Sequence, residues 1–208
     1  MENVMYQYPF KSIPSFAEKR GPRQREVDLR EVIRSMQALL PQRLSGNIDI
    51  VLADQELPVM VDMAKIEVAF LNLIHNAQEA MPTGGQLTIK TGSARLNGNT
   101  IGKGSRCSSK TCAFVSVSDT GSGMDEQTLA RIFEPFYTTK EGTHQGLGLP
   151  VAHHTIREHD GNINIESRLG HGTTVKVYLP LLRKTPARSK PIPLPPAGAY
   201  ASLRFPEW

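Results

Sequence analysis

The stretch Asn72-Leu73-Ile74-His75-Asn76-Ala77-Gln78-Glu79-Ala80 lies in the strongest helical pattern of the chain. Apolar residues recur there at helical spacing, and the pattern stops at Pro82-Thr83-Gly84-Gly85, which predicts a helix over 63–81. Asn72 and Asn76 are four residues apart, so they share one face of an otherwise apolar helix. A buried carboxamide is costly unless a polar group meets it. The pair therefore either bonds to backbone or supplies oxygen to a hard cation that shares water and phosphate oxygens.

A second cluster, Asp119-Thr120-Gly121-Ser122-Gly123-Met124, directly follows a predicted strand over 113–119. An aspartate at this place can accept a hydrogen bond from an exocyclic amine of a base. Gly121 and Gly123 would let the backbone approach a flat ring without interference from a Cβ atom. Taken alone the motif is weakly specific, because Asp-Gly turns after strands are common.

Two further clusters follow in a predicted loop over 121–144. Phe133-Glu134-Pro135-Phe136-Tyr137-Thr138-Thr139-Lys140 places paired aromatics before a lysine, and Gly142-Thr143-His144-Gln145-Gly146-Leu147-Gly148-Leu149 is a glycine-rich segment that opens a predicted helix over 147–159. Backbone amides at the start of a helix suit phosphate, and glycines let a segment open and close. In isolation the aromatics would equally be a local hydrophobic staple and the glycines a flexible linker.

The rest of the pattern predicts an α+β fold. Asp28 with Glu31 three residues later marks the start of a helix. Strands are predicted over 48–52, 59–61, 86–91, 113–119, 162–167 and 173–179, short helical pieces near 128–133, and an extended hairpin loop over 92–112. We expect a two-layer α/β sandwich with the helices on one face of a mixed sheet. Residues 1–27 would be a lead-in segment, 28–182 the domain, and 183–208 a basic, proline-rich, disordered tail.

Composition excludes several classes of protein. Hydrophobic residues make up 39% and charged residues 21% of 208, which is typical of a soluble globular chain. No apolar run approaches the roughly 18 residues that span a bilayer, and the first 16 residues show no secretory pattern. Two cysteines make no disulfide framework, so a cytoplasmic setting without membrane contact is expected. The net charge of +4 is carried by the last 28 residues, so no nucleic-acid-binding face is predicted.

In order and spacing, the four clusters resemble the N, G1, F and G2 boxes of the catalytic domain of sensor histidine kinases. That domain has the Bergerat ATP-binding fold of the GHKL family, shared with DNA gyrase B, MutL and heat-shock chaperone ATPases. The resemblance covers roughly 28–181 and includes Val27–Ile33 and Gly172–Pro180 at its two ends. Residues 80–85 and 136–140 are most similar to the nitrogen-regulation type of sensor kinase. Four boxes in one order are a highly specific signal.

The resemblance implies ATP and Mg²⁺ as cofactors and a role for each matching residue. Asn76 would be the magnesium ligand, assisted by Asn72, and Asp119 would read the adenine amino group. Catalysis would rest on Asn72, Asn76 and Lys140. The nucleotide-binding set would be Asn76, Asp119, Gly121, Gly123, Met124, Phe133, Phe136, Lys140, Gly146, Leu147, Gly148 and Thr174. Within that set Gly121, Gly123 and Thr174 would shape the base pocket, Phe133 and Phe136 would anchor the ATP lid, and Lys140 with the 146–148 amides would meet the triphosphate.

Two positions depart from the common family pattern. The glycine-rich box carries His144-Gln145 where the family often has a single glycine. Glu79-Ala80 stand where many members have a basic and an aromatic residue, although the acidic form is familiar in the nitrogen-regulation type.

A sensor kinase phosphorylates a histidine on a separate two-helix dimerisation domain. None of the six histidines of this chain has the surroundings of such a phosphoacceptor, so the resemblance implies a histidine-bearing domain upstream in cis or supplied in trans, and a response regulator receiver domain as a further partner. Residues 13–19 resemble the end of the second dimerisation helix, and a monomer is expected without that domain. His153 and His154 are expected to pack rather than to bind metal, since consecutive helical residues diverge.

Two alternatives to a kinase remain. A stand-alone ATPase of this fold would place a glutamate base one turn before the magnesium ligand, where this chain has Asn72, and an amide cannot take a proton from water. A non-catalytic module that docks a partner, with nucleotide or through the tail, is the other. Cys107 and Cys112 are expected to be free thiols on the 92–112 loop, with a labile disulfide as the alternative, because two sulfurs without a nearby histidine make a poor metal site.

Overall fold

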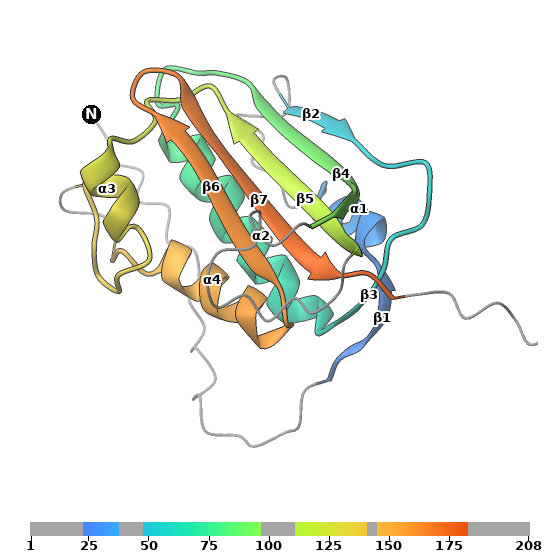
Figure 1. Ribbon diagram of the computed structural model, residues 1–208. Helices are drawn as coiled ribbons and strands as arrows, with labels where there is room; N and C mark the ends of the chain where they lie inside the picture. The colour runs from blue at the N-terminus through green and yellow to red at the C-terminus, as the bar shows by residue number, and fades with distance from the viewer. Residues whose placement is uncertain (1–22, 38–47, 97–110, 141–144, 183–208) are drawn as a thin grey trace, which may run out of the picture.

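The computed structural model describes residues 23–37, 48–96, 111–140 and 145–182. Within these ranges the elements follow one another as β1 (Arg25–Asp28), α1 (Leu29–Gln37), β2 (Ile48–Val51), β3 (Pro58–Val61), α2 (Met63–Glu79), β4 (Leu87–Arg95), β5 (Thr111–Asp119), α3 (Glu126–Arg131), α4 (Gly148–Glu158), β6 (Asn162–Arg168) and β7 (Gly172–Pro180) (Figure 1). No helix among the described residues is long and apolar enough to cross a membrane.

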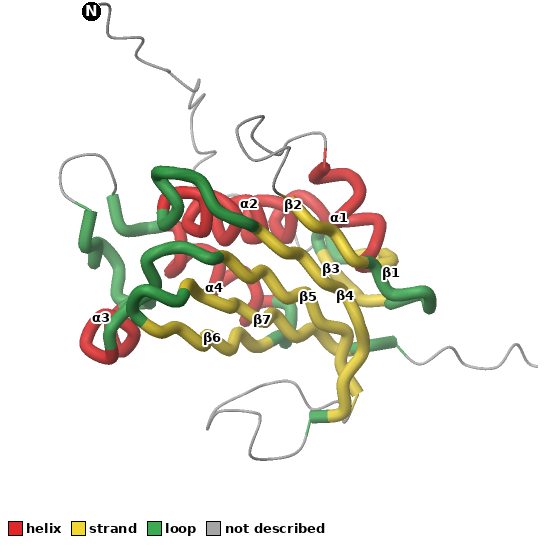
Figure 2. Tube along the Cα trace, turned by 90° about the horizontal axis from the view of Figure 1, so that it is seen from above, coloured by secondary structure: helices red, strands yellow, loops and turns green. Residues whose placement is uncertain are grey.

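Five strands form the main sheet, in the order β2-β4-β5-β7-β6. The β2–β4 pair is parallel and the other neighbours are antiparallel, so the sheet is mixed. Helices α1, α2 and α4 lie against one face of it (Figure 2). The predicted two-layer α+β sandwich is therefore confirmed.

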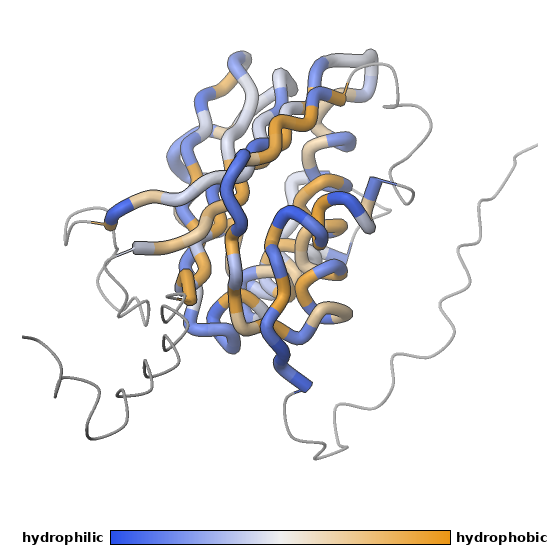
Figure 3. Tube along the Cα trace, turned by 90° about the vertical axis from the view of Figure 1, so that its right-hand side faces the viewer, coloured by the Kyte–Doolittle hydropathy of each residue, from blue (hydrophilic) through white to orange (hydrophobic). Residues whose placement is uncertain are grey.

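The core lies between these two layers, because alternate strand residues point to opposite faces. Val115 and Val117 of β5 are buried there beside Val175 and Val177 of β7. The helices supply the other half of the core with Ile66, Phe70, Leu73 and Ile74 of α2 and Ala152 and Ile156 of α4. Hydrophobic segments accordingly occur in both layers (Figure 3).

A buried histidine joins the two central helices. The ring of His159, just after α4, is 4% exposed. Its Nε2 accepts a hydrogen bond from the backbone N–H of Asp62 at 3.0 Å, so its Nδ1, 2.7 Å from the carbonyl of Thr155, is the donor to that oxygen. Asp62 in turn caps α2 by accepting from the backbone N–H of Lys65 at 3.4 Å. The start of α2 and the end of α4 are thereby fixed to each other.

The predicted loop over 92–112 was too long. Strand β4 continues to Arg95 and β5 begins at Thr111. Gly92, which suggested the end of a strand, pairs with Phe114, and the phenyl ring fills the place that a side chain on the glycine would take. Cys112 is consequently a buried strand residue that packs with Leu96 and Tyr178 and not a loop thiol. Cys107 lies outside the described residues.

The end of the predicted lead-in segment is also ordered. Residues 25–27, together with Asp28, form strand β1, which pairs antiparallel with β3 so that Val27 lies opposite Val59. On its other side Val59 bridges to Leu181, and the backbone N–H of Leu182 donates to the carbonyl of Pro58 at 2.8 Å. The beginning and the end of the domain therefore meet at β3. The predicted lead-in residues 1–22 and the tail 183–208 lie outside the described residues.

Candidate functional site

Asp119 ends strand β5 with a half-buried carboxylate. Its Oδ1 accepts two backbone hydrogen bonds, from Gly121 at 2.9 Å and from Thr173 at 3.2 Å. Among the described residues no group donates to Oδ2. Burial raises the pKa of the Asp119 carboxyl, and this outweighs the two backbone bonds and the charge of Lys140, which lower it. The site thus holds one carboxylate oxygen in place and leaves the other for a donor from outside.

The glycine motif after Asp119 is held against the end of helix α2. A Cβ on Gly121 would lie 2.6 Å from the carbonyl oxygen of Ala80, so only glycine fits there. The carbonyl of Ala80 also accepts from the backbone N–H of Ser122 at 3.0 Å. Further along, Gly123 has φ +64° and packs on the backbone of Arg168, and the backbone N–H of Met124 donates to Oγ of Ser167 at 2.8 Å. Gly121 and Gly123, predicted to shape the base pocket, and Met124, predicted to bind nucleotide, are thus held by these contacts in the loop that follows Asp119.

Thr174 does not join this group. It lies opposite Ser118, with 2.9 Å between the two hydroxyl oxygens, whereas Asp119 lies opposite Thr173. Since strand residues alternate between faces, the side chain of Thr174 points to the sheet face away from Asp119 and the helices. The neighbouring Thr173 is the residue whose backbone N–H supports Asp119. The predicted residue, Thr174, and the residue that contacts Asp119, Thr173, are thus neighbours on β7.

Asn72 and Asn76 lie on helix α2 where the start of α4 meets it. Nδ2 of Asn76 is buried and has no hydrogen-bond partner among the described residues. A Cβ on Gly148 would lie 3.6 Å from that atom and 3.9 Å from Cβ of Asn72, so the first residue of α4 faces both asparagines. The helix interface thus contains a carboxamide whose hydrogen-bonding capacity is unmet.

These residues fit a magnesium–phosphate group. A carboxamide supplies an oxygen to the metal and an N–H to a phosphate oxygen, which would satisfy the Asn76 side chain. No cluster of three or more histidine, cysteine, aspartate or glutamate side chains in the described part of the chain could hold a metal by itself. A cation at Asn76 would therefore take its other ligands from phosphate and water.

Lys140 reaches helix α2 from the segment that follows α3. Its Nζ lies 2.6 Å from Oε2 of Glu79, the last residue of α2. The other carboxylate oxygen of Glu79 lies 3.1 Å from Nδ1 of His75. Sequence reasoning treated Glu79 only as a departure from the family pattern. Glu79 lies in the final turn of a helix that has no basic residue in that turn. This pattern was the sequence signal that a cation from another segment would pair with it.

The two aromatics of the third cluster behave differently. Phe133 packs on the core and stacks on His153, with 4.4 Å between ring centroids, so the packing role expected for this histidine is observed. Burial and the charges of Arg157 and His154 lower the pKa of His153. Phe136 is 74% exposed at φ +66°, so only Phe133 anchors the segment in this conformation.

The glycine-rich cluster closes back on the aromatic one. Gly146, at φ +63°, packs on the backbone of Phe136 and Tyr137, and its carbonyl accepts from the backbone N–H of Phe136 at 3.1 Å. Leu147 is the N-cap of α4 and has no side-chain capping bond, so amides at this helix start are free of a cap. Residues 141–144 of this region lie outside the described residues. The four clusters therefore converge on the C-terminal half of α2, through Gly121, Lys140 and Gly148, whereas the side chain of Phe136 is exposed.

The comparisons with known proteins agree with this geometry. Residues 61–183 match the family model described as "Histidine kinase-, DNA gyrase B-, and HSP90-like ATPase". The sensor kinase CckA of Brucella abortus is 33% identical over 81% of this chain and 18% of its own length. The sensory histidine kinase/phosphatase NtrB of Vibrio alginolyticus is 37% identical over 62% of this chain and 36% of its own length.

Among solved structures, the catalytic domain of the histidine kinase ThkA superposes with a TM-score of 0.58 at 29% identity, over 76% of this chain and 97% of that domain. This chain thus spans 18% and 36% of the two sensor kinases but 97% of an isolated catalytic domain. The chain belongs to the histidine kinase-, DNA gyrase B- and HSP90-like ATPase family, as the ATPase catalytic domain found in sensor histidine kinases.

Proposed function

We propose that this chain binds Mg-ATP and transfers its γ-phosphoryl group to a histidine on a separate dimerisation domain. The observation that carries the proposal is that two groups near the end of α2 lack a hydrogen-bond partner among the described residues, the buried Nδ2 of Asn76 and Oδ2 of Asp119. Asn76 and Asp119 need, respectively, a metal–phosphate group and an amine, and adenine nucleotides carry both.

Each residue has a defined task in this proposal. Oδ2 of Asp119 accepts a hydrogen bond from the adenine amino group, while Gly121, Gly123 and Met124 hold the backbone around the base. Asn76 holds the magnesium ion, with Asn72 beside it, and Lys140 and the backbone at 146–148 bind phosphate oxygens. Magnesium neutralises charge on the phosphate chain, which is the chemistry it supplies in phosphoryl transfer.

Transfer is favoured over hydrolysis by Asn72. Hydrolysis requires a group that takes a proton from water, and the residue one helical turn before Asn76 is an amide that cannot do so. Glu79 lies on α2 three residues after Asn76, and Lys140 and His75 contact its two carboxylate oxygens. Neither position offers the base that a stand-alone ATPase of this fold would need.

Two partner domains follow from the proposed phosphoryl transfer. A histidine-bearing dimerisation domain would supply the phosphate acceptor, and a response regulator receiver domain would receive the phosphoryl group afterwards. We assign the reaction to the cytoplasm, where ATP is available, and the catalytic domain to residues 25–182, because β1 pairs with β3 at the start of the fold.

Phosphotransfer in trans tests the proposal. The chain, Mg²⁺ and γ-labelled ATP are incubated with a purified dimerisation domain that carries the phosphoacceptor histidine, and acid-labile label on that domain is measured. Label should appear with the wild-type chain and be absent with Asn76→Ala, which keeps the helix but removes the proposed ligand. Sustained phosphate release without labelled acceptor would instead make the chain an ATPase.

A further inference from the structure

Glu79 occupies a place where a carboxylate is electrostatically disfavoured. It is the last residue of α2, where the free carbonyls give the helix end a partial negative charge. The last turn of α2 contains no basic residue, and the Glu79 side chain is only 15% exposed. An acidic residue that is disfavoured at a helix C-terminus needs a compensating positive charge, and such exceptions often occur at functional sites.

The compensating charge comes from far along the chain. Nζ of Lys140 lies 2.6 Å from Oε2 of Glu79, and the two residues are 61 positions apart. The backbone near the lysine is itself held, because the N–H of Lys140 donates to Oγ1 of Thr138 at 3.1 Å. The ion pair therefore ties the end of the segment after α3 to the end of α2.

The same lysine is the proposed phosphate ligand. The Lys140 side chain is 37% exposed and meets α2 at Glu79, three residues beyond Asn76. Its charge acts on Asp119 as well. An ammonium group already neutralised by a carboxylate attracts a phosphate less, and the carboxylate also repels the phosphate. A nucleotide would therefore have to compete with Glu79 for Lys140.

We propose that Glu79 is an exchangeable counterion for Lys140, and that the nucleotide phosphates take its place when ATP binds. Glu79 is then an affinity-setting residue: it holds Lys140 at the end of α2 before binding and lowers the affinity for the phosphate chain. This inference rests on the proposed function, since it deepens the assignment of Lys140 to phosphate binding.

Calorimetric titration with a non-hydrolysable ATP analogue and Mg²⁺ tests the exchange. Glu79→Gln keeps a hydrogen-bond acceptor of nearly the same shape but removes the charge, and should tighten binding about three- to tenfold. Glu134→Gln is the matched control. This exposed acid lies in the same segment but pairs with Arg131 at 2.9 Å, so its loss should leave the affinity unchanged.

A second pair of variants separates exchange from a general loss of negative charge. In a Lys140→Gln background, Glu79→Gln should no longer tighten binding, because there is no ammonium group to release. Thermal unfolding of each variant checks that the fold is kept.

Unchanged or weaker binding by a folded Glu79→Gln variant, or an equal gain without Lys140, would overturn the exchange while leaving nucleotide binding intact. If Glu79→Gln does not fold, the nucleotide affinities of the wild-type and Lys140→Gln chains are compared instead. Lys140→Gln would then have to weaken binding, and unchanged affinity would overturn the exchange. Absence of nucleotide binding by the wild-type chain would instead overturn the proposed function, and this inference with it.

Discussion

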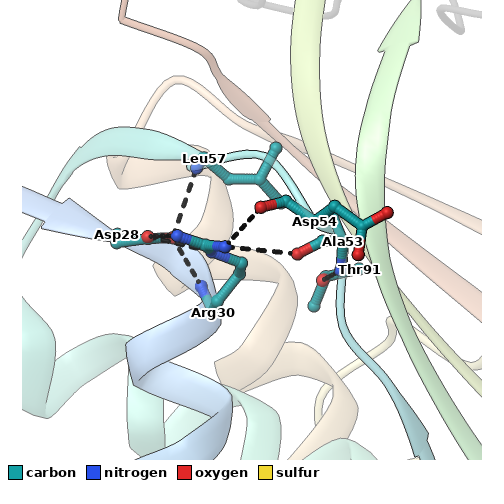
Figure 4. Close-up of polar contacts among 6 residues, drawn as sticks. All are labelled: Asp28, Arg30, Ala53, Asp54, Leu57 and Thr91. Carbon is teal, nitrogen blue, oxygen red and sulfur yellow. Dashed lines mark hydrogen bonds and ion pairs between the residues drawn. The ribbon is translucent and has the colours of Figure 1, made fainter.

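Asp28 and Asp119 accept the same number of backbone hydrogen bonds at Oδ1, but only Asp28 has a described donor at its other carboxylate oxygen, Oδ2. Each ends a strand, and Oδ1 of each accepts two backbone hydrogen bonds, from Arg30 and Leu57 in one case and from Gly121 and Thr173 in the other. The guanidinium group of Arg30 also donates to both oxygens of Asp28 and to the carbonyls of Ala53 and Asp54 (Figure 4). In the part of the chain that the structure describes, no comparable cation contacts Asp119.

The pKa values of the two carboxyls respond in opposite directions. Burial would raise the pKa of Asp28, but the bonds from Arg30 and Leu57 outweigh it and hold that pKa below its ordinary value. Burial raises the pKa of Asp119 because its hydrogen bonds and the more distant Lys140 compensate only in part. The difference indicates that the network at Asp28 stabilises the fold, whereas Oδ2 of Asp119 receives no hydrogen bond from the described residues.

Substitution of Asp119 by asparagine should produce the largest change in nucleotide binding. Asparagine keeps an oxygen for Gly121 and Thr173 but turns an N–H toward the base in place of Oδ2. The lost hydrogen bond to a charged group should weaken ATP binding about ten- to hundredfold, as measured by calorimetry. The melting temperature should not fall, because a carboxylate disfavoured by burial has been removed. Unchanged affinity would show that Asp119 does not read the base.

The same substitution at Asp28 should affect stability instead of binding. Asp28→Asn breaks the pair with Arg30, whose side chain is 15% exposed, and should cost about 2 kcal/mol of unfolding free energy at pH 7. Nucleotide affinity of the folded variant should stay as in the wild type. Chemical denaturation and calorimetry on one preparation measure both quantities. Weaker nucleotide binding without lost stability would assign Asp28 to the site and remove the contrast.

Acid should erase the difference in stability between the wild type and Asp28→Asn. A carboxyl whose folded-state pKa is lowered stabilises the fold above its unfolded pKa, about 3.8, and this contribution disappears as the pH falls through the folded value. For Asp119, whose pKa is raised, the ionised form is a net cost at neutral pH that disappears on acidification. In denaturation series between pH 7 and pH 3, the unfolding free energy of Asp28→Asn should therefore start below that of the wild type and approach it as the pH falls. That of Asp119→Asn should start at or above the wild-type value and approach it from above. Gaps that do not change with pH would refute the electrostatic contrast.

Substitution of Thr174 by valine should have the smallest effect. The hydroxyl bonds to Ser118 on the sheet face away from Asp119, so its loss should leave nucleotide affinity within about twofold and cost about 1 kcal/mol of stability. A larger loss of affinity in the calorimetric titration would return Thr174 to the base pocket.

The sequence predicted the clusters well and their detailed pairing less well. The Asn72–Asn76 spacing and the strand before Asp119 were predictable because helical and strand periods are local properties. The face on which Thr174 lies was not predictable, because one residue along a strand decides the face and only the register with β5 fixes it. The Glu79–Lys140 contact could not be predicted because it joins two segments that only the fold brings together.

The lengths of β4 and β1 show the same limit. Gly92 weakens a strand locally, yet the ring of Phe114 on the neighbouring strand fills the space beside it. Residues 25–28 contain one apolar residue, Val27, and become a strand because β3 offers a partner edge. In both places a tertiary contact decided what local propensity left open.

The most direct test is calorimetric titration of the wild-type chain with ATP and with GTP, each with Mg²⁺. Guanine carries a carbonyl where adenine carries its amino group, so it offers Asp119 an acceptor that the carboxylate repels instead of a donor. ATP should bind at least about tenfold tighter than GTP. Equal affinity for the two nucleotides, or tighter binding of GTP, would contradict the proposed role of Asp119.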